Sequence, residues 1–108
     1  MADPLLEATY RVRLQNRNLP EGMHDGLIRY LVYGLPPGSF LEAVLSNDLL
    51  EAVKRCDPVN EAHLADYVKF LYNHAPAQAW GTPERVWSWI ESKARPRSPD
   101  AASAPTRS

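Results

Sequence analysis

Histidine, cysteine and serine are the side chains through which this sequence could bind a metal ion or attack a substrate. His24, His63 and His74 lie at least eleven residues apart, and Cys56 is the only cysteine. A zinc site needs several such ligands at close helical or C-x-x-C spacing, and no serine lies in a G-x-S-x-G nucleophile elbow. The sequence therefore predicts no catalytic residue, no metal site and no cofactor. We expect a protein that is not an enzyme.

The tryptophans give a more specific indication of binding. Trp80 and Gly81 precede an expected helix that carries Trp87 and Trp89, and these two positions lie about 200° apart around a helix. One of the two therefore faces away from the core. We expect it to be Trp87, because the opposite face carries the stronger apolar spacing. The simpler interpretation is that Trp80 folds over the bundle and shields one of the two tryptophans. The functional interpretation is a surface for a partner or for self-association.

Polar residues extend this candidate surface. Asn47, Asp48 and Asn73 lie in or beside expected helices, where such side chains either cap helix ends or contact a partner. Capping is the simpler interpretation. The candidate binding surface predicted from the sequence consists of Asn47, Asp48, Asn73, Trp80 and Trp87.

The composition is that of one soluble globular domain. The chain has 108 residues, of which 44% are hydrophobic and 23% charged, which is typical of this class. The net charge is -1, and residues 19–95 hold ten acidic against seven basic side chains, so nucleic acid is not an expected partner. No apolar run approaches the ~20 residues of a membrane span, and no signal peptide is recognisable. We expect a cytoplasmic protein without membrane attachment.

The two ends of the chain differ from its body. Residues 1–18 fit one helical face, but Tyr10, Val12 and Leu14 also alternate as in a strand. We interpret this segment as an N-terminal arm that is either a short helix or irregular. Residues 96–108 consist mainly of Pro, Ser, Ala and Arg, which bury too little apolar surface to order a chain. A disordered C-terminal tail is predicted there.

The body, residues 19–95, is expected to be an all-α domain: a compact bundle of about four short helices. The first spans residues 23–33, where apolar side chains recur at helical spacing. Gly34 follows and can end a helix in the left-handed conformation. Two prolines come next and cannot continue the helix, so a tight turn results.

The second helix is expected over residues 40–55. Ser39 precedes Glu42 by three residues, a spacing that predicts a capping box at the start of this helix. One continuous helix is the favoured interpretation. The alternative is a break at residues 46–48 with Asn47 as a new cap, because these residues prefer caps to helix interiors.

Cap residues also mark the third and fourth helices. Either Asp57, with proline after it, or Asn60 can cap the third, which runs to about His74. Thr82, again followed by proline, caps the fourth, which runs to about Ala94.

The apolar positions of the second and third helices are expected to face the core. In the second helix these are Leu41, Val44, Leu45, Leu49, Ala52, Val53 and Cys56. In the third they are Leu64, Tyr67, Val68, Leu71 and Ala75, with Phe70 and Tyr72 widening the stripe.

Short sequence motifs in residues 19–95 resemble those of a known family. They are Pro37-Gly38-Ser39-Phe40-Leu41, Ala43-Val44-Leu45, Asn47-Asp48-Leu49, Phe70-Leu71-Tyr72-Asn73, Ala75-Pro76 and Trp80-Gly81. The stretch from Gly34 to Ile90, about half of the chain, is similar to a family of small uncharacterised helical proteins of tailed phages and prophages. The resemblance implies a phage or prophage origin and carries over no activity and no functional residue.

Two functional hypotheses follow. The first is a non-enzymatic phage or prophage accessory protein of the host cytoplasm that binds a protein, either a host factor or a second copy of itself. The second is a protein that binds or sequesters a small, nucleotide-like ligand by tryptophan stacking and a helix N-terminus. A polar pocket containing Trp80, Asn47 or Asn73 would favour the ligand, and a flat apolar patch would favour the protein partner.

Overall fold

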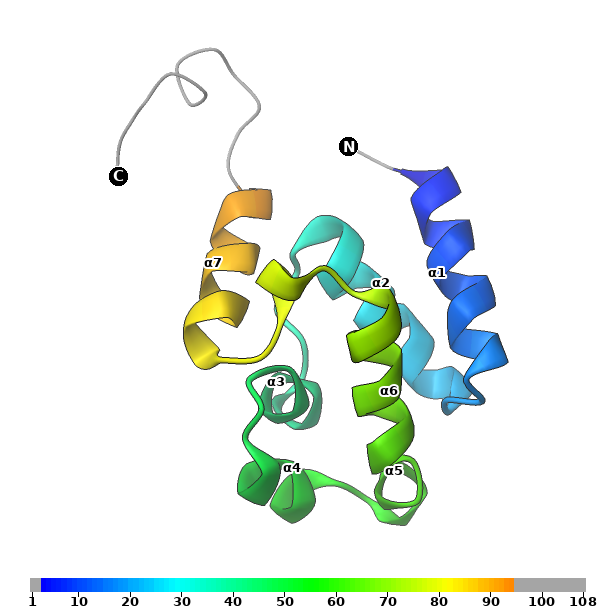
Figure 1. Ribbon diagram of the computed structural model, residues 1–108, viewed down its shortest axis with the longest axis vertical. Coiled ribbons are helices and arrows are strands. Elements are labelled where there is room, and N and C mark those ends of the chain that lie inside the picture. Colours follow the sequence, from blue (N-terminus) through cyan, green and yellow to red (C-terminus); the bar gives the residue numbers. More distant parts are fainter. Residues whose placement is uncertain (1–2, 95–108) are drawn as a thin grey trace.

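The computed structural model describes residues 3–94, which form a helical domain with no strand in that range, as Figure 1 shows. Its elements in chain order are α1 (Pro4–Asn16), the 3-10 turn η1 (Glu21–Met23), α2 (His24–Tyr33), α3 (Ser39–Leu45), α4 (Leu49–Arg55), α5 (Pro58–Glu61), α6 (Leu64–His74), the 3-10 turn η2 (Ala77–Ala79) and α7 (Pro83–Ala94). The predicted all-α class is confirmed. The tail predicted at residues 96–108 lies outside the described residues.

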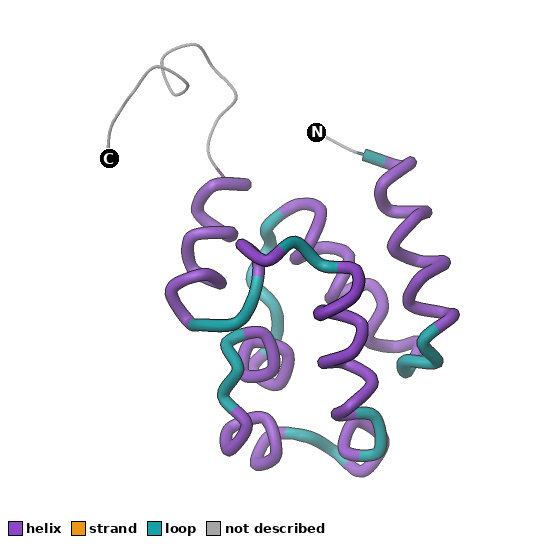
Figure 2. Tube along the Cα trace, in the orientation of Figure 1, coloured by secondary structure: helices purple, strands orange, loops and turns teal. Residues whose placement is uncertain are grey.

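α2 packs between α1 and α7. α1 lies against α2 and α6, while α7 packs on α2 and on η2. α3 lies beside α4 and also contacts α7. Figure 2 shows α5 as a single turn that joins α4 to α6. Because α2 contacts both α1 and α7, it connects the two sides of the domain.

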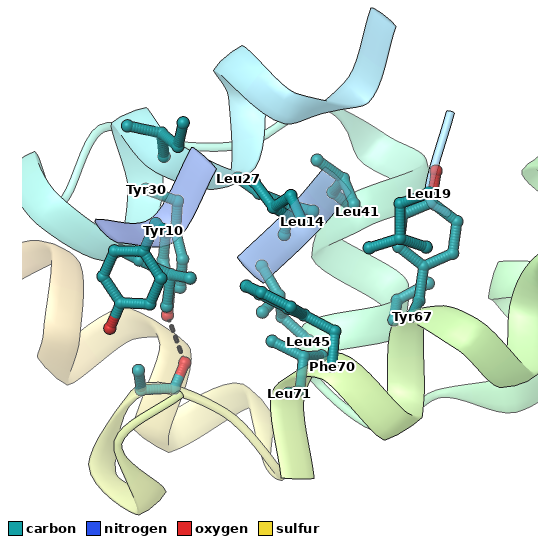
Figure 3. Packing of buried hydrophobic residues seen from close by; sticks show 14 of the residues in the cluster. Tyr10, Leu14, Leu19, Leu27, Tyr30, Leu41, Leu45, Tyr67, Phe70 and Leu71 are labelled. Carbon is teal, nitrogen blue, oxygen red and sulfur yellow. Dashed lines mark hydrogen bonds between the residues drawn. The ribbon is translucent and has the colours of Figure 1, made fainter. Parts of the chain in front are cut away.

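Aromatic rings fill the core among leucines of α1, α2, α3 and α6, as Figure 3 shows. The buried Tyr30 hydroxyl donates a hydrogen bond to the Ala79 carbonyl at 2.5 Å. The buried Tyr67 hydroxyl donates to Asn60 Oδ1 at 2.6 Å. Burial raises the pKa of both tyrosines, so each hydroxyl keeps its proton and satisfies a buried acceptor.

The N-terminal segment is a helix. The Asp3 carboxylate caps α1 by accepting a hydrogen bond from the Leu6 amide at 3.2 Å. Tyr10 and Leu14 are buried in the core and Val12 is exposed. Tyr10 and Leu14 are four residues apart and so share one face of the helix, which explains their joint burial without a strand.

Two helix ends lie where their residues predict them. Gly34 follows α2 with a φ of 70° and donates its amide to the Tyr30 carbonyl at 2.9 Å. Thr82 caps α7, its hydroxyl oxygen accepting from the Arg85 amide at 3.1 Å. Both signals are local, so packing elsewhere does not change them.

The predicted third helix is two helices. Asp57, and not Asn60, is the cap of the first, with its carboxylate accepting from the Asn60 amide at 2.8 Å. That helix, α5, ends after one turn at Glu61, and residues 62–63 form a turn before the next helix. The second, α6, begins at Leu64 and ends at His74 as predicted.

The predicted capping box is wrong. α3 begins at Ser39 itself, so Gly38 holds the cap position and no side chain caps this end. The Glu42 amide donates to the Gly38 carbonyl at 2.8 Å, as an ordinary helical bond. Ser39 lies one residue too late for its hydroxyl to act as the cap.

The continuous helix over residues 40–55 is also wrong. α3 ends at Leu45, and Asn47 takes a left-handed conformation with a φ of 63°, which asparagine tolerates better than most residues. Asp48, rather than Asn47, is the cap of α4, because its carboxylate accepts from the Glu51 amide at 3.2 Å.

This break changes which residues face the core. Of the residues in α4 only Ala52 is buried, whereas Leu49 and Val53, which a continuous helix would have buried, are exposed. On α6 the buried residues are Tyr67, Phe70 and Leu71. Val68 and Tyr72, also predicted inside, are exposed.

Candidate functional site

α4 is a short helix with its apolar side chains in solvent. Leu49, Leu50 and Val53 are all exposed, and only the small side chain of Ala52 reaches the core. A surface helix ordinarily turns its apolar face inward. Three branched apolar residues on the outer face of a seven-residue helix therefore need another cover.

A groove of about 180 Å³ lies between α4 and α6. It is lined by Ala43 and Val44 of α3, by Asn47 and Asp48, by Leu49 and Ala52 of α4, and by Leu64, Ala65 and Val68 of α6. Seven of these nine residues are apolar, so the groove offers shape and hydrophobic contact with few polar groups to orient a ligand.

The exposed face of α6 continues this groove. Ala65, Val68 and Tyr72 follow one another at i, i+3 and i+7, and all three are exposed. We name the α4–α6 surface for its six exposed members, which are Leu49, Leu50, Val53, Ala65, Val68 and Tyr72. Its five larger side chains leave roughly 500 to 600 Å² in solvent, the upper end for the largest patch of an ordinary monomer.

Three charged side chains of α4 next to this surface are paired with one another. Glu51 accepts hydrogen bonds from Lys54 Nζ at 3.3 Å and from Arg55 Nε at 3.0 Å. Both hydrogen bonds lower the pKa of the Glu51 carboxyl, and the bond from Lys54 has the larger effect. Together with Asp48, which precedes α4, this gives two carboxylates and two cations along the helix. The surface therefore has no strong excess of either charge.

The structure brings together two of the five residues predicted as the binding surface. Asn47 and Asp48 line the groove, although Asp48 is engaged as the cap of α4. Asn73 is exposed, and its amide nitrogen donates to the Lys69 carbonyl at 2.8 Å. Neither Asn73 nor the tryptophans line this groove.

The tryptophans divide as their spacing predicts. Trp87 is 64% exposed, whereas Trp89 packs against the core and donates its indole N–H to the Tyr30 carbonyl at 3.0 Å. The Lys93 ammonium lies 4.7 Å from the centroid of the Trp89 ring. Trp80 is half-buried against the core. Trp87 is therefore the exposed tryptophan of α7.

The sequence interpretation missed the four members of the α4–α6 surface that it placed inside the core: Leu49, Val53, Val68 and Tyr72. The signal that could have identified the first two was present. Residues 46–48 all prefer helix ends, and a break there removes the constraint that α4 continue the buried face of α3.

Two further hollows are more polar or more open. One, of about 340 Å³, lies beside α3 and α4 and is lined by three carboxylates, those of Glu42, Asp48 and Glu51, with one guanidinium, that of Arg55. The other, of about 470 Å³, lies between η2 and α7 and is lined by Pro76, Gln78, Ser88, Trp89 and Ser92. Neither presents a basic side chain free to bind phosphate.

Within residues 3–94 no three His, Cys, Asp or Glu side chains lie where together they could hold a metal ion. None of the helices in that range is long and apolar enough to cross a membrane.

Comparisons with protein families, with curated proteins and with solved structures found no match to this chain.

Proposed function

We propose that this protein is a non-enzymatic accessory protein that acts by binding a protein partner through the α4–α6 surface. The observation that carries the proposal is the outward orientation of Leu49, Leu50 and Val53 on α4. Apolar side chains gain their free energy by leaving water, and about half or more of each of these three stays in solvent within the chain itself. A protein that covers them would supply it.

The shape of the surface supports a protein partner over a small ligand. Pockets for small ligands usually measure about 300 to 1,000 Å³, and the apolar groove measures about 180 Å³. The 340 Å³ hollow is lined by three carboxylates and one guanidinium, a balance that repels phosphate. A nucleotide-like ligand would find too little room in the groove, and in the 340 Å³ hollow the cation, Arg55, is already paired with Glu51.

The resemblance of residues 34–90 to phage and prophage proteins supports an origin in a phage or prophage and a place of action in the host cytoplasm. The acidic balance of residues 19–95 supports a protein rather than nucleic acid as the partner. These two parts of the proposal rest on the sequence alone.

Affinity capture of the full chain from cells that encode it tests the proposal. Val68→Glu introduces a charge into the α4–α6 surface, and Val12→Glu introduces the same charge at a matched site on α1. The two valines are 49% and 55% exposed and both lie inside helices. We expect the parent and the Val12 variant to retain the same protein and the Val68 variant to lose it.

Two results would count against the proposal. One is a protein retained equally by the parent and both variants, which would place the contact elsewhere. The other is a small molecule that co-purifies with the parent in equal molar amount, which would favour the ligand-binding alternative.

A further inference from the structure

We propose that the partner at the α4–α6 surface is a second copy of this chain, with Leu50 of each copy seated in the groove of the other. The inference rests on the proposed function, because it names the occupant of the same surface. Leu50 is 68% exposed and stands on α4 beside the groove without lining it. Leu50 lies about 100° around α4 from Leu49, which lines the groove. A projecting side chain therefore borders the hollow.

The hollow has the size of the side chain. An apolar cavity of about 150 Å³ can hold a benzene ring, so a groove of about 180 Å³ has room for the smaller side chain of leucine. Its walls are mostly methyl and methylene groups from α3, α4 and α6. A leucine placed there would make dispersion contacts on several sides.

Two-fold symmetry makes this arrangement self-complementary. In an isologous dimer each patch contacts its own copy, so residue i meets residue j and residue j meets residue i. A projection and a hollow on the same patch can therefore both be satisfied in one dimer. The contact also closes, so it adds no further copies.

Area and charge fit a small dimer. If each copy covers roughly 500 to 600 Å² of side-chain surface, the pair buries roughly 1,000 to 1,200 Å², the lower end of specific interfaces. The charges of α4 are already paired around Glu51, so two copies approach without strong like-charge repulsion. We expect dissociation in the micromolar range.

Sedimentation velocity of the full chain from about 1 µM to about 300 µM tests the dimer. The weight-average mass should rise from that of one 12.2 kDa chain towards twice that value. Leu50→Lys and Val68→Glu should each raise the dissociation constant at least about thirtyfold, because each change disrupts both symmetric contacts. An equal mixture of the two variants should associate again. In the mixed dimer the lysine of the Leu50 variant meets the glutamate of the Val68 variant, and Leu50 of the Val68 variant enters the unaltered groove of the other chain.

The chain offers a closely matched control. Leu5 and Leu50 are both the second residue of a helix whose cap is an aspartate, Asp3 or Asp48, and Leu5 is 79% exposed. Leu5→Lys therefore changes helix electrostatics in the same way and should leave association unchanged. If Val68→Glu proves unfolded by circular dichroism, the Leu50 and Leu5 pair still decides whether Leu50 is at the interface.

Three results would overturn the inference. They are a parent that stays monomeric at every concentration, a dimer whose dissociation constant is unchanged by Leu50→Lys, and two variants that fail to associate when mixed. A monomeric parent whose α4–α6 surface still captures another protein would leave the proposed function intact. Loss of both self-association and capture would remove the two proposals together.

Discussion

Gly34→Ala should be among the most destabilising single changes in this domain. Gly34 has a φ of 70°, and a Cβ built there would overlap with Cβ of Lys93 and lie 2.8 Å from its Cγ. A left-handed conformation costs an L-residue about 1 to 2 kcal/mol, and overpacking costs about 1 to 3 kcal/mol. Because Lys93 Cβ is fixed to the backbone of α7, the whole end of that helix must shift. The expected loss is about 2 to 5 kcal/mol.

Urea denaturation followed by circular dichroism measures this loss. Gly22→Ala is the control, because a Cβ at Gly22 meets nothing within 4 Å and its φ is not positive; its stability should stay within about 1 kcal/mol of the parent. Gly34→Asn separates the two costs, since asparagine tolerates the left-handed conformation but still carries a Cβ. Parent-like stability of both Gly34 variants would refute the close packing of α7 on the end of α2.

Three further changes test the described contacts. Asp48→Ala should cost about 0.5 to 2 kcal/mol by removing the cap of α4, whereas Ser39→Ala should be nearly neutral, as urea midpoints will show. Tyr67→Phe should cost about 1 to 3 kcal/mol, because Asn60 Oδ1 stays buried without its donor; thermal melting measures it. Burial, and then the charges of Arg13 and Arg17, lower the pKa of His74 below 6.5. The folded state thus binds this proton more weakly than the unfolded state, so stability should fall as pH drops below 6.5, and His74→Gln should flatten that part of a stability-against-pH curve.

The elements that the sequence predicted well are those set by local signals. Gly34 and Thr82 mark helix ends through their own backbone and side-chain chemistry. The opposite orientations of Trp87 and Trp89 follow from helix geometry alone. None of these depends on which other helices pack nearby.

The faces of α4 and α6 depended on contacts that no local pattern specifies. The ring centroids of Tyr10 on α1 and Phe70 on α6 lie 6.3 Å apart. Because Phe70 packs inward against α1, Val68 is left on the exposed side of α6. Interpreting the N-terminal segment as an arm removed this contact from consideration. A break at residues 46–48 is one of the two alternatives that the sequence allows. The preference of these three residues for helix ends cannot be weighed against a continuous apolar stripe without the packing of α3 on α7.

Site-specific photo-crosslinking in cells tests most directly whether a protein covers α4. A benzophenone amino acid is placed at Leu50 in one variant and at Leu5 in the other, and the products are identified by mass spectrometry. We predict a protein adduct at Leu50 that is absent at Leu5, and a mass of two chains if the partner is a second copy. No adduct at Leu50, or the same adducts at both positions, would contradict a protein-binding role for the α4–α6 surface.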